Sequence, residues 1–248
     1  MRRPHDREEV MMPNRQFKAL LFDVQGTLTD FRTTLLDHGQ AVLGDRTPVV
    51  EWPSMVDEWR AAYRAEVAEL SGAQQWRSVR AIYATGLADI IRRRGLEDGV
   101  TAEEILLLTD GWEQLRPWPD AADGLRSLRR DHLVAALSNA DYSAVLSTSR
   151  ACGFDWDAVF SAQQFRAFKP DHSTYLGAAA LLGVDPEQIL MVASHRYDLD
   201  AAAALGLGTA FMHRPHEYGP EGHADQAADG DYDVVVHSVE ELAEALQR

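Results

Sequence analysis

The stretch "KALLFDVQGTLTD", residues 18–30, decides the fold. Its apolar first half has the length and composition of a buried strand in a parallel sheet, and it ends abruptly in a carboxylate, Asp23. Gln25, Gly26 and Thr27 follow at once. Asp and Gly are common turn residues, so the segment alone is equally compatible with a simple turn. In an open parallel sheet, however, ligands collect beyond the carboxyl ends of the strands, which makes Asp23 a candidate functional residue.

Further apolar runs of similar length recur along the chain, with Ala- and Leu-rich stretches between them: residues 133–138, 157–162, 189–194, 208–213 and 233–237. Runs of this length, several of them rich in Val, Ile and Phe, are typical of parallel strands joined by crossover helices. The sequence therefore predicts an α/β fold built on a doubly wound, Rossmann-like parallel sheet.

The connection between the first two predicted strands is too long for a simple crossover. Inside it, residues 52–70, 76–94 and 101–115 carry helical periodicity without the alternation of a strand. Pro117 and Pro119 then mark the return to the core, and Asp120 is expected to cap the next helix. We therefore expect a flexible N-terminal segment, a core domain in two pieces and a helical cap domain inserted in the core: residues 1–16, residues 17–34 with 116–248, and residues 35–115.

The composition is that of an ordinary globular protein, with 248 residues, 46% of them hydrophobic and 25% charged. A formal net charge of −15 argues against nucleic acid as a partner and is compatible with a small anionic substrate held by local cations. No apolar run approaches the roughly 18 residues of a membrane span, and the first residues lack the apolar region of a signal peptide. The single cysteine, Cys152, permits no internal disulfide, so we expect a cytoplasmic location.

Polar side chains follow other predicted strands as well. Ser138 and Asn139 follow the second strand, and Ser194, His195 and Asp198 follow the fourth. Each has a plain structural alternative: Asn139 could cap a helix, His195 could be a hydrogen-bonded loop residue, and Asp198 could be an acid favoured at a helix N-terminus. The sheet would bring all of them to one edge, and this joint placement favours a functional site.

Several segments, taken in order, resemble the four motifs of the haloacid dehalogenase superfamily: "DVQGTLTD" (23–30), "LSN" (137–139), "FKPDHSTY" (168–175) and "VASHRYD" (192–198). Their spacing covers nearly the whole chain after residue 17, and the third adds Lys169 and Tyr175 to the candidates. Within the superfamily the chain is most similar to the 2-haloacid dehalogenase branch. "EWR" (58–60) in the expected cap resembles that branch's cap arginine, and "SHRYD" resembles its Ser-Asn-x-x-Asp loop.

This resemblance implies a role for each matching residue. Asp23 would be the nucleophile, forming an ester that water hydrolyses at the aspartyl carbonyl. Lys169 would keep Asp23 ionised, Asp198 would position or activate the water, and Arg60 would meet the leaving group or the substrate carboxylate. The predicted catalytic residues are Asp23, Thr27, Lys169, His195 and Asp198. The predicted substrate-binding residues are Gln25, Arg60, Ser138, Asn139, Tyr175 and Ser194, and no metal or other cofactor is expected.

Gln25 distinguishes between branches of the superfamily. In the superfamily that the chain resembles, phosphatases carry a second Asp at this position and another acid where Ser194 stands here. A carboxamide cannot donate a proton as an acid, and the loss of two carboxylates weakens a Mg²⁺ site that depends on hard oxygen ligands. Displacement at carbon therefore ranks above Mg²⁺-dependent phosphoryl transfer. A non-enzymatic protein of this fold would predict loss of Asp23, Lys169 or Asp198, and all three are present.

The sequence also departs from the dehalogenase pattern. That branch usually has an aromatic residue at Gln25, an asparagine at His195 and a tryptophan at Tyr197. The pocket should be more polar, and His195 can carry a proton near neutral pH, which an amine leaving group needs and a halide does not. The alternative is therefore an L-azetidine-2-carboxylate hydrolase, which opens the ring to 4-amino-2-hydroxybutyrate. In both hypotheses the partners are a small carboxylate-bearing substrate and water, with the homodimer of related dehalogenases as the expected assembly.

Overall fold

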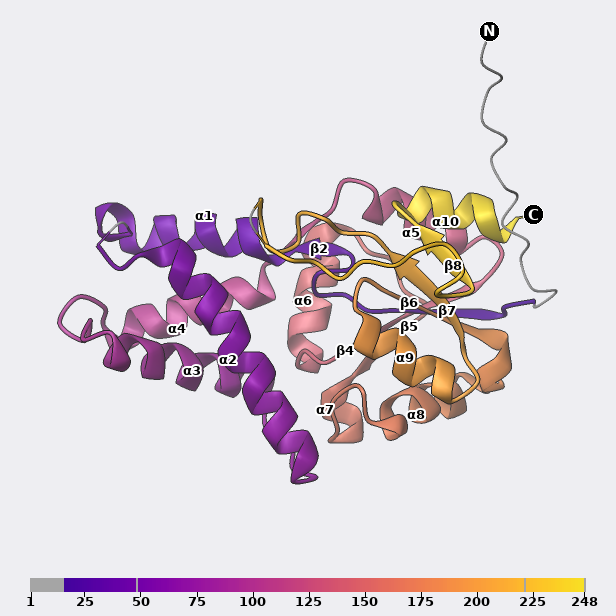
Figure 1. The fold of residues 1–248 in the computed structure, drawn as a ribbon, viewed down its shortest axis with the longest axis horizontal. Helices are drawn as coiled ribbons and strands as arrows, with labels where there is room; N and C mark the ends of the chain where they lie inside the picture. Colours follow the sequence, from indigo (N-terminus) through magenta and orange to yellow (C-terminus); the bar gives the residue numbers. More distant parts are fainter. Residues whose placement is uncertain (1–15, 48, 221, 248) are drawn as a thin grey trace, which may run out of the picture.

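The computed structural model describes residues 16–47, 49–220 and 222–247, and the N-terminal segment expected to be flexible lies outside them except for Gln16. The core is a six-stranded parallel sheet of order β5-β4-β1-β6-β7-β8 (Figure 1). Its strands are β1 Ala19–Phe22, β4 Leu133–Ser138, β5 Ala158–Ser161, β6 Ile189–Ala193, β7 Gly208–Met212 and β8 Val234–Val236. Each lies within a predicted apolar run, so the predicted fold class is confirmed.

Strand β1 lies at the point where the strand order reverses. The chain proceeds from β1 to β4 and β5 on one side, and then returns to β6, β7 and β8 on the other. In doubly wound sheets this switch point opens a crevice at the carboxyl ends of the strands. Asp23, the residue directly after β1, is therefore at the position where such folds bind ligands.

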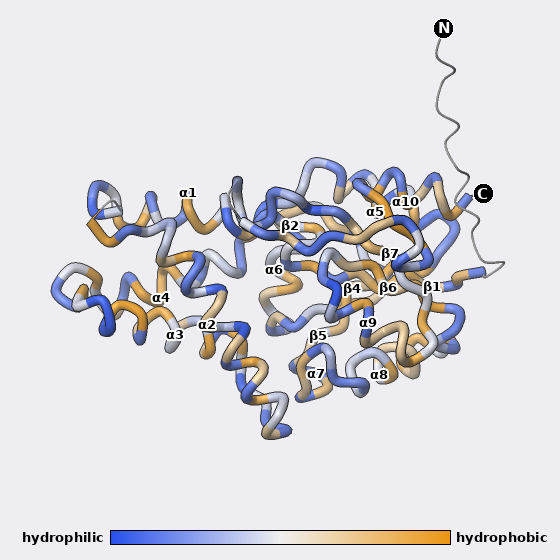
Figure 2. Tube along the Cα trace, in the orientation of Figure 1, coloured by the Kyte–Doolittle hydropathy of each residue, from blue (hydrophilic) through white to orange (hydrophobic). Residues whose placement is uncertain are grey.

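Helices cover both faces of the sheet. Leu20 and Phe22 pack with helices α5 Ala121–Leu128 and α10 Val239–Leu246, whereas Ala19 and Leu21 pack with α8 His172–Leu182 and α9 Arg196–Ala204. This division follows from the alternation of side chains along a strand. Figure 2 shows the result as hydrophobic strands enclosed by more hydrophilic outer turns. The remaining elements of the core are α6 Tyr142–Cys152, α7 Ala162–Phe165 and the 3-10 turn Pro186–Gln188.

A helical segment projects from the carboxyl edge of the sheet, at the left of Figure 1. It contains α1 Phe31–Leu43, α2 Trp52–Gly72, α3 Val79–Arg93 and α4 Ala102–Asp110, with 3-10 turns at Gly44–Arg46 and Gly111–Glu113. The chain enters and leaves it through the antiparallel pair β2 Thr29–Asp30 and β3 Arg116–Pro117. The expected boundary at residues 34 and 35 falls inside α1, and we keep the division into a core and a cap domain as a proposal.

The helical segment has its own apolar cluster, rich in aromatic side chains such as Trp52, Trp59, Tyr83 and Trp112. A carboxylate of the core holds one end of it in place. Asp141, at the N-terminus of α6, accepts hydrogen bonds from the hydroxyl of Ser78 and from the backbone N–H groups of residues 79 and 80, at 2.7, 3.1 and 2.9 Å. These N–H groups are the unsatisfied donors of the first turn of α3, so this contact joins the cap helices to the core.

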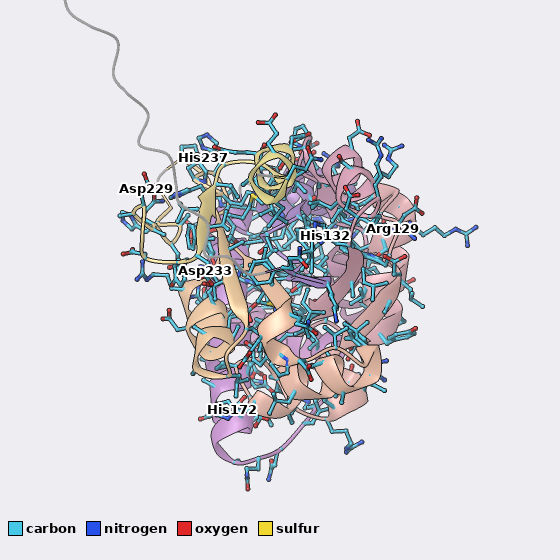
Figure 3. All side chains as sticks on the ribbon, turned by 90° about the vertical axis from the view of Figure 1, so that its right-hand side faces the viewer. Arg129, His132, His172, Asp229, Asp233 and His237 are labelled. Atoms are coloured by element: carbon cyan, nitrogen blue, oxygen red, sulfur yellow. The ribbon has the colours of Figure 1, made fainter. Side chains whose placement is uncertain are left out.

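Ionisable side chains at the opposite end of the core have structural partners. Figure 3 looks onto that end and labels, among others, Arg129, His132 and Asp233. Arg129 pairs with Asp157 at 2.6 Å, His132 contacts the carbonyl oxygen of Phe17, and Asp233 accepts from the backbone N–H of residue 209. They join loops to strands at the amino ends, away from the crevice. Among the helices of the described ranges, none has the length and apolarity needed to cross a membrane.

Candidate active site

Asp23 and Asp198 share one ammonium group. Lys169 Nζ lies 2.9 Å from Asp23 Oδ1 and 2.5 Å from Asp198 Oδ2, and all three side chains are buried. The sheet brings them together because each belongs to a segment that follows a different strand: β1, β5 and β6. Oδ1 of Asp198 accepts a second bond, at 2.5 Å, from the hydroxyl of Tyr175 on α8. The predicted nucleophile is therefore held by a paired, hydrogen-bonded cation.

The second oxygen of Asp23 is held by a hydroxyl. Thr27 Oγ1 donates to Asp23 Oδ2 at 2.8 Å and accepts from the backbone N–H of Ser194 at 2.9 Å. Thr27 lies in the turn after β1 and Ser194 directly after β6, so this bond joins the ends of two neighbouring strands. It fixes the rotation of the Asp23 carboxylate.

His195 lies between two carboxylates. Its Nε2 lies 2.9 Å from Glu217 Oε1 and its Nδ1 lies 3.4 Å from Asp23 Oδ2. In the described part of the chain Nδ1 has no closer hydrogen-bond partner, although it is buried. Gly26 permits this arrangement: it has a φ of +92°, and a Cβ atom there would lie 2.3 Å from Glu217 Oε1. The glycine of the opening stretch therefore makes room for the pair of His195 and Glu217.

Glu217 comes from the loop that follows β7, and an ion pair fixes that loop. Arg214 donates to both oxygens of Asp120, at 3.0 and 2.8 Å, and to the carbonyl oxygen of Thr27 at 2.8 Å. Asp120 was expected to cap α5, but its side chain makes no capping bond there, because Arg214 and the backbone N–H of Val239 bind both of its oxygens. The carboxylate thus anchors the loop that carries Glu217.

The cap contributes a buried guanidinium. Arg60 on α2 donates from Nη1 to the hydroxyl of Tyr83 at 2.7 Å and approaches Gln25 Oε1 at 3.4 Å. Aromatic rings surround it, with the Phe31 and Tyr63 centroids 4.9 and 5.1 Å from its central carbon. Its Nε is buried without a hydrogen-bond partner, and in the described part of the chain no carboxylate forms an ion pair with it.

A cavity of about 380 Å³ lies between Arg60 on the side of the helical segment and Lys169 and His195 on the side of the core. That volume is in the range of sites for small molecules. Lys169 and His195, which contact Asp23, line one side of it, and helix α2 lines the other. The lining residues are Gln25, Arg60, Tyr63, Arg64, Val67, Ala68, Ser71, Asn139, Lys169, Pro170, His195, Tyr197 and Tyr218.

Comparison with known proteins identifies the family of the chain. The family model of the haloacid dehalogenase-like hydrolases matches residues 17–206. The chain belongs to this hydrolase family. Among solved structures, the L-2-haloacid dehalogenase PA0810 superposes with a TM-score of 0.86 at 37% identity, over 93% of this chain and 99% of that one. The defluorinating L-2-haloacid dehalogenase Rha0230 gives a TM-score of 0.85 at 31% identity, over 95% and 100%. A curated relative, the (S)-2-haloacid dehalogenase 4A of Burkholderia cepacia, is 28% identical over 81% of this chain and 86% of its own length.

The charged side chains of this site shift one another's pKa values. Burial alone would raise the pKa of Asp23, but the charge of Lys169 and the contact with His195 outweigh it and hold that pKa well below its usual range. Burial alone would lower the pKa of His195, but the charge of Glu217 and the contacts with Asp23 raise it to about 10. Burial also raises the pKa of Asp198, against the opposing charge of Lys169. Near neutral pH the site therefore holds an ionised Asp23 between two protonated bases.

Five of the eleven predicted site residues line the cavity: Gln25, Arg60, Asn139, Lys169 and His195. Asp23, Thr27 and Asp198 do not line it, but Asp23 contacts two residues that do, Lys169 and His195. Ser138, Tyr175 and Ser194 are buried and do not line the cavity. Tyr175 binds Asp198, and Ser194 binds Thr27. Both residues therefore fix other site residues, and the predicted contact with substrate is wrong for them. Ser138 accepts a bond from the backbone N–H of Ala140 at 3.2 Å, at the end of β4.

Asn139 has a structural role in addition to lining the cavity. Its side-chain oxygen accepts from the backbone N–H of Lys169 at 2.7 Å, and its amide nitrogen donates to the carbonyl oxygen of Lys169 at 3.2 Å. The plain alternative, that Asn139 caps the following helix, is wrong, because Asp141 is at the N-cap position of α6. Asn139 instead sets the backbone that directs Lys169 toward Asp23.

The sequence reasoning missed Glu217. The rule that identified the other candidates, a polar residue following a strand, also applies to the loop after residues 208–213, and Glu217 is the first acid in that loop. Its significance lay in a non-local contact with His195 that no spacing reveals. In the described ranges no group of three or more His, Cys, Asp or Glu side chains is arranged to hold a metal ion.

Proposed function

We propose that this hydrolase displaces the halide from the 2-carbon of a small (S)-2-haloacid, with Asp23 as the nucleophile. The observation that carries the proposal is the buried guanidinium of Arg60, which forms no ion pair with a carboxylate of the described residues. It lines the same cavity as Lys169 and His195, the two residues that contact Asp23. An uncompensated buried cation is costly, so the cavity favours an anionic ligand that pairs with it. A 2-haloacid supplies both that anion and an electrophilic carbon.

The first step is an in-line displacement. An oxygen of Asp23 forms a bond to the 2-carbon while the halide leaves on the opposite side with the bonding electrons, which gives an aspartyl ester. Lys169 and Thr27 hold the carboxylate ionised and fixed in rotation, so little reorganisation is needed before attack. Arg60, on the cap side, is placed to receive the substrate carboxylate or the leaving halide.

The second step is hydrolysis of the ester. Water adds to the carboxyl carbon of Asp23, and the charge that develops on Oδ1 is stabilised by Lys169 Nζ, 2.9 Å away. We keep Asp198 as the proton acceptor for this water. Burial raises its pKa, which moves it toward the range in which a carboxylate is an effective general base.

The alternative, ring opening of L-azetidine-2-carboxylate, is supported by Gln25 and His195, which make the cavity wall more polar than a hydrocarbon pocket. Two observations rank it second. His195 Nδ1 faces the nucleophile, whereas a leaving amine departs on the far side of the attacked carbon. Arg60, Arg64 and Lys169 also line the cavity, and such cations repel the ring nitrogen in its protonated form.

Phosphoryl transfer and a non-enzymatic role rank lower. Gln25 provides an amide where an acid would be needed to protonate a leaving oxygen, and the ammonium of Lys169 lies between the two carboxylates. The complete set of paired residues argues against an inactive protein. We also keep the cytoplasm as the expected location and a homodimer as the expected assembly.

Assays with three substrates test the proposal: (S)-2-chloropropionate followed by halide release, L-azetidine-2-carboxylate followed by a new primary amine, and p-nitrophenyl phosphate with Mg²⁺. We expect catalytic halide release and formation of the 2-hydroxy acid with inverted configuration, since a single displacement inverts the carbon. Turnover of the azetidine alone would select the alternative. Hydrolysis of the phosphate ester alone would overturn both.

A further inference from the structure

We propose that Glu217 is a positioning residue that holds His195 as the proton donor to the product oxygen when the aspartyl ester is hydrolysed. The inference rests on the proposed function, and it assigns the two residues to the second step of that reaction. Glu217 is fully buried and pairs with Nε2, which leaves Nδ1 directed at Asp23 Oδ2.

The two oxygens of Asp23 have different surroundings, which separates their roles. Oδ1 is 2.9 Å from the ammonium of Lys169, so it is suited to remain the carbonyl oxygen and to carry negative charge in the tetrahedral intermediate. Oδ2 accepts from the hydroxyl of Thr27 and lies 3.4 Å from Nδ1 of His195, which is farther than Lys169 lies from Oδ1, so its charge is held less tightly and it is the better nucleophile. We assign Oδ2 as the oxygen that attacks the substrate and later leaves with the product.

The proton transfers balance with this assignment. Water adds its oxygen to the carboxyl carbon of Asp23 and gives one proton to Asp198. The bond from that carbon to Oδ2 breaks, Oδ2 leaves as the alkoxide of the 2-hydroxy acid, and it takes the proton from Nδ1 of His195. The regenerated carboxylic acid of Asp23 then returns its remaining proton to His195. The proton on Asp198 passes to solvent, so one proton and one halide are released per turnover.

Nδ1 is suited to this transfer because it has no competing acceptor. It is buried, it has no hydrogen-bond partner within the described residues, and it lies 3.4 Å from Asp23 Oδ2, the oxygen that becomes the product alkoxide. Nδ1 lies on the nucleophile's side of the substrate carbon, so it cannot serve the leaving group of the first step. The pair therefore acts on the ester and not on the carbon–halogen bond.

Ionisable groups face His195 from every element packed against it. Asp23 follows β1, Glu217 follows β7, Tyr197 is on α9 with its ring centroid 5.7 Å away, and Lys169 and Arg60 line the same cavity. Glu217 and Asp23 both favour the protonated ring. Formation of the ester removes the charge of Asp23, which leaves Glu217 as the carboxylate that keeps His195 protonated until the product departs.

Glu217→Gln tests the inference with (S)-2-chloropropionate as the probe. We expect a near-stoichiometric burst of halide at a rate within about threefold of the unmodified protein. Ester hydrolysis should be about 10²-fold slower, within the range of general acid catalysis. The covalent ester should then accumulate and be visible by intact mass. The alkaline limb of the hydrolysis rate should also move to lower pH, because His195 loses the charge that holds its proton.

Glu104→Gln is the matched control, since it makes the same acid-to-amide change in an ion pair, that with Arg46, whose residues do not line the cavity or hold the Glu217 loop. We expect it to accumulate no ester. If Glu217→Gln slowed halide release and ester hydrolysis equally, it would accumulate no ester, like the control, and the inference would be overturned.

If Glu217→Gln does not fold, the pH dependence of ester hydrolysis in the unmodified protein tests the inference. Its single-turnover ester hydrolysis must slow as pH rises above the pKa of His195 in the intermediate, and a pH-independent rate would overturn the inference. If the unmodified protein forms no ester at all, the proposed function itself fails, and this outcome is distinct from the others.

Discussion

The two walls of the cavity differ in how their charges are compensated. On the core wall, Asp23, Lys169 and Asp198 form a continuous set of ion pairs, and His195 is held between two carboxylates. On the cap wall, Arg60 is surrounded by aromatic rings and pairs with no carboxylate of the described residues. Under the proposed function, the core wall is complete before substrate arrives, whereas the substrate completes the cap wall. The comparison therefore predicts that substitutions on the core wall affect folding and chemistry, and that substitution of Arg60 chiefly affects the interaction with substrate.

The largest effect is expected from Asp23→Asn. An amide oxygen is a poor nucleophile, so turnover of (S)-2-chloropropionate should fall by about 10⁴-fold or more. The variant should keep the fold, because Lys169 still pairs with Asp198. Single turnover of the unmodified protein in ¹⁸O water gives an independent measure: the label should enter Asp23 before it enters product. Label found directly in the product, or full activity in the variant, would contradict the covalent route.

Lys169→Met should remove the ion pairs of the core wall and lower both the stability and the activity of the protein. Removing one partner of a buried pair leaves uncompensated charge, which costs about 3–5 kcal/mol of the free energy of unfolding. Urea denaturation at neutral pH measures this loss.

The pH dependence of this variant follows from the pKa of Asp23. In the unmodified protein that pKa is held below its usual value, chiefly by Lys169 against the effect of burial, so the pair stabilises the fold above the pKa of the unfolded chain and less as pH falls. Without the lysine both buried carboxylates bind protons more readily. The gap in stability between the two proteins should therefore narrow on acidification, and a gap that widened would contradict the ion-pair interpretation.

The fold and most residues of the core wall could be predicted from the sequence. Strand ends in a parallel sheet converge, so Asp23 and Asp198 could be placed together from the order of the apolar runs, whereas Lys169 was identified through the resemblance of "FKPDHSTY" to a family motif. Side-chain direction could not be read in this way. Tyr175 belongs to the same motif as Lys169, but it lies on α8 while Lys169 precedes that helix, and only Lys169 lines the cavity. The hydroxyl of Tyr175 donates to Asp198 instead.

The loop after β7 shows the second limit of sequence reasoning. Glu217 reaches His195 only because Arg214 ties the loop to Asp120, residues far apart in the chain. The aromatic surroundings of Arg60 likewise depend on rings from separate helices, Phe31 and Tyr63 among them. Its isolation from carboxylates, which carries the functional proposal, is a property of the packed cap and not of any local pattern.

Arg60→Met is expected to lower stability and activity together less than the two substitutions above, and it tests the difference between the two walls most directly. The substitution keeps much of the side-chain volume and removes a buried cation that pairs with no carboxylate of the described residues. The free energy of unfolding should change by no more than about 1–2 kcal/mol, the scale of the cation–π contacts that are lost. Loss of the partner of a buried substrate anion costs about 2–5 kcal/mol of binding, so kcat/KM for (S)-2-chloropropionate should fall by roughly 30- to 4,000-fold. Arg64→Met is the matched control, one turn later on α2, where the guanidinium donates to the Tyr218 hydroxyl at 3.1 Å at the cavity's outer side. It should lower kcat/KM much less than Arg60→Met. If Arg60→Met destabilised the fold as much as Lys169→Met, the two walls would not differ in the way the structure indicates.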